Sequence, residues 1–517
     1  METVDPVGVT DGTVDAHQYI GATVERNDRN PVLIQGGMGA GVSEWRLARA
    51  VSQAGQLGVV SGTALDVILV RRLQVGDAGG HMRRAMAEFP LPGIVEGILE
   101  RYFIEGGKAA DKPFKANPVP AIKPSRKLEE LMIVGNFVEV YLAKEGHDGL
   151  VGINFLEKIQ TPNLCSIFGA MLADVDYVLM GAGIPRTIPG VLDQLAKGEE
   201  VELRIDVKGA DKDEKFFTRF DPVAFCGGQA PNLKRPLFLG IVASATLATM
   251  LARKSTGRVD GFIVEGPTAG GHNAPPRGKL QLSIAGEPVY GDRDVVDLKA
   301  MKDLGLPFWL AGSFAEPERI VEALQTGAAG VQIGTAFAYC DESGLERGIR
   351  ASVLEMSRAG TAKVFTDPVA SPTGFPFKVV VMKGTLSEQD EYEERSRICD
   401  LSYLRHAYKK EDGKVGWRCP SEPIKDYLRK GGAEEDTKGR KCVCNGLLAN
   451  LGLGQSRPDS IVEKALITSG DDVAHVARFL KPGKQSYSAV DVIEYLLGDS
   501  RNLTDAQTKT DGLSVSL

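Results

Sequence analysis

The sequence predicts an α/β protein built on a (β/α)8 barrel, or TIM barrel, that carries a helical insertion, a β-hairpin insertion and a mainly helical C-terminal extension. Two observations predict the barrel. Short apolar runs of the kind found in buried parallel strands recur between residues 31 and 340, and helical patterns separate them. Eight such runs occur without any sign of a closing antiparallel edge, which favours a barrel over a doubly wound sheet.

The predicted strands alternate with helices along the chain. The first run ends in a glycine-rich loop, after which Ser43 is the expected N-cap of a helix over residues 43–51. Further helices are expected over residues 162–173, 189–197, 244–254 and 316–326 and after Asp341. The eight expected strands are residues 31–35, 57–60, 150–154, 177–180, 237–242, 262–264, 307–310 and 330–333.

Three segments depart from this alternation and set the expected domain organisation. Residues 1–30 form a polar N-terminal arm, residues 31–384 the barrel, and residues 385–517 a C-terminal extension. The barrel carries an insertion at about 76–147, with helical patterns on both sides of a proline-rich stretch. Residues 200–220 alternate apolar and polar side chains about a turn, which predicts a β-hairpin. Within the extension, helices are expected over residues 460–467, 473–479 and 489–497, followed by a disordered tail.

Composition limits the classes of function. The chain of 517 residues has a net charge of −7 with both signs interspersed, so no basic face for nucleic acid is expected. The acidic start is unlike a signal peptide, and the most apolar window, residues 237–252, is too short and mixed for a membrane span. We therefore expect a cytoplasmic protein that acts on a small molecule, and a homo-oligomer is compatible with this composition.

One loop carries the clearest chemical signal. The buried run 262–264 ends at Glu265, and the paired glycines Gly270 and Gly271 then deliver His272, one of six histidines. Glycine allows the backbone to approach a flat ligand and to adopt positive φ, and the loop presents the imidazole at the strand end. His272 is thus the candidate catalytic base, although a loop histidine without a role is the plain alternative.

The loops after the last two strands predict a phosphate site. Gly312 and Ser313 follow the seventh strand, and Gly334 and Thr335 follow the eighth. Phosphate in this fold is often held by these two loops, where small residues expose backbone N–H groups and helix N-termini add positive potential. Tight turns explain each glycine equally well, but their occurrence in both loops favours a phosphate-bearing cofactor.

Several motifs together resemble the nitronate monooxygenases, formerly called 2-nitropropane dioxygenases. They are Ile34-Gln-Gly-Gly-Met-Gly39 with the run to Val59, Glu265-Gly-Pro-Thr-Ala-Gly-Gly-His272, Gly327 to Phe337, and Ser371-Pro-Thr-Gly-Phe375. The resemblance implies an FMN-binding barrel in which His272 is the base or charge partner of the substrate. It implies cofactor contacts at Gly37, Met38, Asn154, Glu265, Gly271, Gly312, Ser313, Gly334 and Thr335. The family usually has glutamine where Glu265 stands.

Three functions remain open from the sequence. The resemblance implies an FMN-dependent oxidoreductase of the nitronate monooxygenase type, which oxidises a small nitronate-like or other acidic carbon substrate and is reoxidised by oxygen. A related alternative is an NAD(P)H-dependent quinone or enoyl-thioester reductase on the same barrel, and a different class is a non-redox phosphate-binding lyase or isomerase.

The extension gathers four of the seven cysteines, Cys399, Cys419, Cys442 and Cys444. Four thiols in one cytosolic segment predict a zinc ion or an iron–sulfur cluster, although C-x2-C pairs are absent. Ordinary buried thiols are the alternative.

Overall fold

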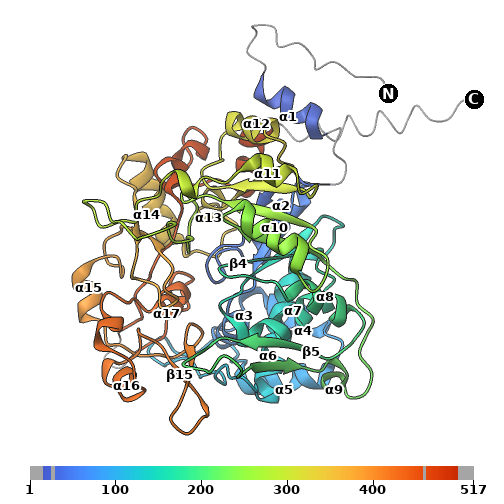
Figure 1. Cartoon of the computed structure of the whole chain (residues 1–517), viewed down its shortest axis with the longest axis vertical. Helices are drawn as coiled ribbons and strands as arrows, with labels where there is room; N and C mark the ends of the chain where they lie inside the picture. The colour runs from blue at the N-terminus through green and yellow to red at the C-terminus, as the bar shows by residue number, and fades with distance from the viewer. Residues whose placement is uncertain (1–14, 25–29, 458–460, 499–517) are drawn as a thin grey trace, which may run out of the picture.

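The computed structural model describes residues 15–24, 30–457 and 461–498. Its centre is a sheet of eight parallel strands in the order β1-β11-β10-β9-β8-β4-β3-β2 (Figure 1). A parallel bridge between Ile34 and Leu57 joins the first and last strands, so the sheet closes into the predicted barrel. The strands are β1 (Leu33–Gln35), β2 (Gly58–Ser61), β3 (Val151–Leu156), β4 (Tyr177–Gly181), β8 (Leu237–Val242), β9 (Gly261–Glu265), β10 (Phe308–Ala311) and β11 (Gly330–Ile333).

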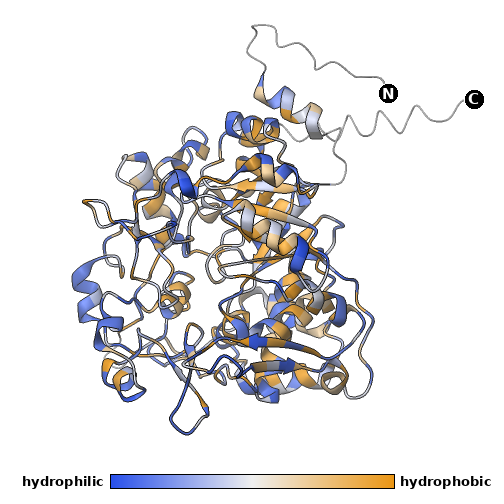
Figure 2. Cartoon of the chain, viewed as in Figure 1, coloured by the Kyte–Doolittle hydropathy of each residue, from blue (hydrophilic) through white to orange (hydrophobic). Residues whose placement is uncertain are grey.

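The barrel interior is apolar because alternate residues of each strand point inward. Ile34, Val59, Leu179, Ile263 and Trp309 belong to one buried cluster inside the barrel, and Trp309 donates its indole N–H to Pro31 O at 2.7 Å. The opposite side chains pack against the helices that surround the sheet. Hydrophobic residues accordingly concentrate on the strands and on the inner helix faces (Figure 2).

Helices surround the barrel much as the sequence predicts. The helix α2 begins at Trp45 rather than at Ser43, which is a correction: Ser43 Oγ instead accepts a hydrogen bond from Met38 N at 2.9 Å and thereby holds the glycine loop. The surrounding helices are α2 (Trp45–Gln53), α7 (Gln160–Leu172), α8 (Ile188–Ala196), α10 (Ala245–Lys254), α11 (Leu298–Lys302), α12 (Pro317–Gln325), α13 (Thr335–Ala338) and α14 (Arg347–Arg358).

Between β2 and β3 the chain forms helices, and after β4 it forms the predicted hairpin. The long helix α6 packs on α7, α3 and α2, and 13 of its 19 residues are buried. The hairpin pairs β5 and β7 antiparallel, Leu203 opposite Thr218. These elements are α3 (Leu65–Gln74), α4 (His81–Ala87), α5 (Pro92–Tyr102), α6 (Arg126–Lys144), β5 (Val201–Ile205), β6 (Val207–Lys208), β7 (Phe216–Phe220) and α9 (Pro222–Cys226).

The segment after the barrel mixes helices with strands that the sequence did not predict. The hairpin β14–β15 pairs with β6, and β12 pairs with β13. Residues 461–467 form no helix, residues 471–479 form a 3-10 helix, and the predicted helix at 489–497 is present. The elements are β12 (Val364–Asp367), β13 (Phe377–Val380), α15 (Gln389–Glu394), β14 (His406–Lys409), β15 (Val415–Arg418), α16 (Ile424–Arg429), α17 (Val443–Ala449) and α18 (Ala489–Leu497).

Part of the predicted N-terminal arm is helical. The helix α1 (Ala16–Val24) contacts α12 and α18, and Ile20 is buried among them. The predicted disordered tail lies outside the described residues. No helix within the described ranges has both the length and the apolar character required to span a bilayer.

Candidate functional site

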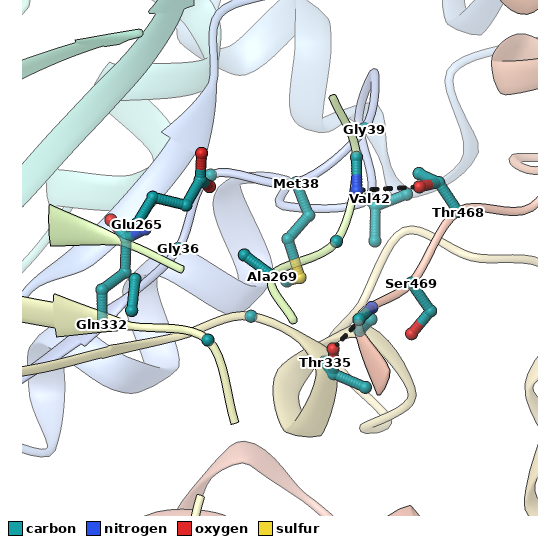
Figure 3. Close-up of a pocket in the computed structure, with 18 of the residues that line it drawn as sticks. Gly36, Met38, Gly39, Val42, Glu265, Ala269, Gln332, Thr335, Thr468 and Ser469 are labelled. Carbon is teal, nitrogen blue, oxygen red and sulfur yellow. Dashed lines mark hydrogen bonds between the residues drawn. The ribbon is translucent and has the colours of Figure 1, made fainter. Parts of the chain in front are cut away.

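One pocket of about 190 Å³ lies at the carboxyl ends of the barrel strands, where chemistry occurs in this fold (Figure 3). All the residues that the sequence assigned to catalysis and cofactor binding line this one pocket. They are Gly37, Met38, Asn154, Glu265, Gly271, His272, Gly312, Ser313, Gly334 and Thr335. The structure therefore brings together residues from several strand ends far apart in the sequence.

Close backbone packing and unpaired amides form one end of the pocket. A Cβ on Gly37 would lie 2.4 Å from Asn154 Cβ, so the loop after β1 reaches β3 only because residue 37 is glycine. Asn154 Oδ1 and Gln332 Oε1 are buried with no hydrogen-bond partner in the described chain. Because buried polar atoms are normally paired, these two oxygens indicate a ligand that carries hydrogen-bond donors.

The loops after β10 and β11 present free backbone donors. Gly312 and Ser313 have positive φ values of 105° and 57°, which turn the loop sharply; the value at Ser313 is uncommon for a residue with a side chain. The N–H groups of Ser313 and Thr335 donate no hydrogen bond within the described part of the chain. Two unpaired donors on adjacent loops suit a phosphate group.

His272 sits in apolar surroundings against aromatic rings. Its ring centroid lies 4.7 Å from that of Phe377, and its Nε2 shares a hydrogen bond of 2.6 Å with Ser371 Oγ. Burial lowers the pKa of His272 to about 4. The imidazole is therefore neutral at physiological pH and suits the role of a base better than that of a charge partner.

Glu265 is the second titratable group of the pocket. It ends β9 and lines the pocket beside Gly36 and Gln332 (Figure 3). Burial raises the pKa of Glu265 to about 7. The usual order of the two groups is thus inverted, because the carboxyl retains its proton near neutral pH and the imidazole does not.

The C-terminal segment supplies one wall of the pocket, which the sequence did not predict. Gly271 N donates to Thr468 Oγ1 at 3.0 Å, and Gly470 N donates to Thr335 Oγ1 at 3.0 Å (Figure 3). The buried Lys378 forms an ion pair with Asp471 and holds this segment in place. A Thr-Ser-Gly loop has no periodicity or motif, so no sequence signal marked it.

The four cysteines of the extension do not form the predicted metal site. They line one small cavity, yet within the described ranges no group of three or more Cys, His, Asp or Glu side chains is placed to hold a metal ion. Burial raises the pKa of Cys442 to about 11 and that of Cys444 well above its usual value. The prediction of zinc or an iron–sulfur cluster is therefore unsupported, and Cys419 and Cys442 are buried thiols that act in packing.

Comparison with known proteins supports the resemblance seen in the motifs. Residues 229–373 match the family model described as nitronate monooxygenase, which confirms the predicted resemblance over this stretch. A nitronate monooxygenase of Pseudomonas aeruginosa is 31% identical over 136 residues, which cover 26% of this chain and 37% of the relative. One from Paraburkholderia phytofirmans is 33% identical over 114 residues, 22% of this chain and 30% of the relative. The chain thus spans about a third of the length of these relatives.

A longer match and two solved structures complete the comparison. A Mycobacterium tuberculosis protein described as a hydroxy-methyl-oxo-octahydro-indene-carboxyl-CoA dehydrogenase is 26% identical over 247 residues, 45% of this chain and 64% of the relative. FabK from Thermotoga maritima has a TM-score of 0.46 and 15% identity, covering 95% of this chain and 98% of that one. Nitroalkane oxidase from Streptomyces ansochromogenes has a TM-score of 0.44 and 16% identity, covering 93% and 99%.

Proposed function

We propose that this protein is an FMN-dependent oxidoreductase of the nitronate monooxygenase type. It would oxidise a small nitronate-like or other acidic carbon substrate, with oxygen as the final electron acceptor. The observation that carries the proposal is the pocket itself, which combines unpaired amide oxygens, free backbone donors and a neutral imidazole in one cavity.

The residues of the pocket fit FMN at both ends. Asn154 and Gln332 offer buried acceptors to the donor edge of a flat ring, and the close approach of Gly37 leaves room beside them. Ser313 and Thr335 offer backbone donors to a phosphate. A bound flavin would supply the electron acceptor, and the chain supplies binding, orientation and proton transfer.

His272 would act on the substrate as a general base. On a carbon acid that still holds its α-proton, the neutral imidazole has a nitrogen free to take that proton; a nitronate has already lost it and needs no base. The hydrogen bond between Nε2 and Ser371 Oγ fixes the ring orientation. Phe377 keeps water from one side of the ring. Proton removal places negative charge on the substrate carbon next to the electron acceptor.

A second candidate, an NAD(P)H-dependent reductase of enoyl thioesters, is favoured by another cavity. This cavity measures about 570 Å³; its lining includes the cations Lys158, Arg204, Lys208 and Lys212 and the carboxylates Asp206, Asp211 and Glu214. Pro372 and Thr373, next to Ser371, also line it, so it lies close to the histidine. The cationic side chains of this neighbouring cavity suit the phosphate groups of a CoA or carrier-bound thioester. The match to a carboxyl-CoA dehydrogenase supports this alternative.

Two measurements test these proposals. Denaturing the purified protein should release FMN, identified by chromatography against FMN and FAD standards; a colourless preparation or release of FAD would refute flavin binding as proposed. Nitrite released from an alkyl nitronate in the presence of oxygen supports the first candidate. NADH or NADPH oxidation that depends on an enoyl thioester, without nitrite release, supports the second.

A further inference from the structure

Glu265 stands between the main pocket and a second, smaller cavity. It lies in register with Ala311, which in turn pairs with Gln332, at the upper end of the barrel interior. Since Ile263 points into the barrel, the side chain two residues later points to the same side. Glu265 lines the main pocket and also a cavity of about 40 Å³ on its other side.

The carboxyl of Glu265 has no partner. No hydrogen bond or ion pair to this side chain occurs within the described ranges, and burial alone raises its pKa. The small cavity also contains Arg277, whose guanidinium donates to Ala243 O at 3.1 Å and whose backbone N–H donates to Asp294 Oδ1. An unpaired, buried carboxyl changes its protonation state readily when the charge beside it changes.

The small cavity connects Glu265 with the protein surface. Its wall includes Tyr290, whose hydroxyl donates to Ala274 O at 3.0 Å, and the exposed residues Ala274 and Arg277. A space of this size holds one or a few water molecules, and the hydroxyl, carboxylate and carbonyl groups around it are suitable water partners. A proton can therefore reach Glu265 from solvent without crossing the main pocket.

The other charged groups around the two cavities are engaged. Asp472 of the main pocket is paired with Arg478 at 2.9 Å, and Asp294 accepts hydrogen bonds from backbone N–H groups. Burial lowers the pKa of His272 to about 4 and raises that of Tyr290 to about 12, so both are neutral near pH 7. Burial holds the pKa of Glu265 at about 7, which leaves it as the group that titrates there.

We propose that Glu265 is a redox-linked proton carrier, which binds a proton from the small cavity when the flavin is reduced and releases it when the flavin is oxidised. The proposal rests on the proposed binding of FMN. Reduction delivers two electrons and one proton, leaving one negative charge on the cofactor. Glu265 is ionised in the oxidised protein above neutral pH. The negative charge on the reduced cofactor then makes the Glu265 carboxylate take up a second proton. Each cycle then moves two protons with two electrons, and reoxidation returns both.

The test compares the wild type with Glu265→Gln, which keeps the shape and removes the titration, and with Glu318→Gln on the exposed face of α12 as a matched control. The midpoint potential of the bound flavin is measured between pH 7.5 and 9 by dithionite titration with mediator dyes. Each proton taken up with two electrons changes the equilibrium tenfold per pH unit, or about 30 mV. We expect a slope of about 60 mV per pH unit in the wild type and in Glu318→Gln, and about 30 mV in Glu265→Gln.

A second measurement does not depend on the variant. Reduction of the wild-type protein in weak buffer at pH 8, with a pH indicator and with the protons released by the reductant subtracted in a protein-free control, should consume about one proton more per flavin than the one that accompanies reduction itself. Equal slopes in all three proteins, or uptake of a single proton by the wild type, would overturn the proposal. A preparation that contains no flavin would instead refute the proposed function.

Discussion

Replacing Gly37 by alanine tests whether the close contact between the first loop and β3 builds the pocket. The added Cβ would lie 2.4 Å from Asn154 Cβ and 3.3 Å from Val59 Cγ1, whereas carbon atoms pack at about 3.5–4.0 Å. Asn154 Cβ is attached directly to the backbone of β3, so the strand or the loop must move. We expect a loss of about 1–3 kcal/mol in stability, the usual cost of overpacking, together with a lower flavin content.

The neighbouring glycine is the matched control. A Cβ on Gly36 would lie 3.5 Å from the nearest atom, Gln332 Cδ, which is ordinary contact. The urea concentration at the unfolding midpoint should therefore be nearly the wild-type value for Gly36→Ala and lower for Gly37→Ala. The double variant Gly37→Ala with Asn154→Gly removes the clashing atom, so its loss should be smaller than the sum of the single losses. Equal stability of the two alanine variants, or strict additivity in the double variant, would refute the packing argument.

The remaining predictions concern the base, the C-terminal wall and the thiols. With a neutral nitroalkane as substrate, His272→Ala should retain flavin and fold but lose roughly 10²–10⁴-fold in turnover, and His272→Asn should not restore it, because a neutral base and not a charge is removed; wild-type rates in single-turnover flavin reduction would refute this. Protonation of His272 itself should lower the rate only below about pH 4–5, since the pKa of this base is about 4; any change near pH 7 would come from Glu265. Gly470→Ala, whose Cβ would lie 2.8 Å from Thr335 Oγ1, should lower the flavin content more than Gly97→Ala in α5, where no atom lies within 4 Å; equal flavin content in the two variants would show that the wall does not support the cofactor site. Burial raises the pKa of the thiols of Cys419, Cys442 and Cys444, so their alkylation at pH 8 should be slow in the folded protein and fast in urea. Rapid labelling of any of the three in the folded chain would contradict their burial.

The barrel and the strand-end residues were predictable because their signals are local. Most strands are short apolar runs followed by glycine or another small residue, and the fold then places those ends on one face. His272 and Gly312 could thus be assigned to one pocket from the sequence. The inverted protonation of Glu265 and His272 could not, because burial by distant segments sets both pKa values.

The C-terminal wall escaped prediction for the same reason. The contact between Gly271 and Thr468 joins residues 197 positions apart, and nothing in either local sequence announces it. The four cysteines are a different case: they do line one small cavity, as their closeness in sequence suggested, yet within the described ranges no group of three or more Cys, His, Asp or Glu side chains is placed to hold a metal ion. Ser43 had the composition of a helix cap, but its hydroxyl binds the glycine loop.

The wall formed by residues 468–470 also sets the order in which the molecule is completed during synthesis. All eight barrel strands have been translated once Ile333 is added, but the pocket lacks one side until Gly470 follows. At translation rates of about 5–20 residues per second, this interval lasts roughly 7–30 seconds. A barrel emerging from the ribosome therefore exposes its open strand ends to the surrounding solution before they are covered, and a cofactor that binds in this interval would be enclosed by the last segment to fold.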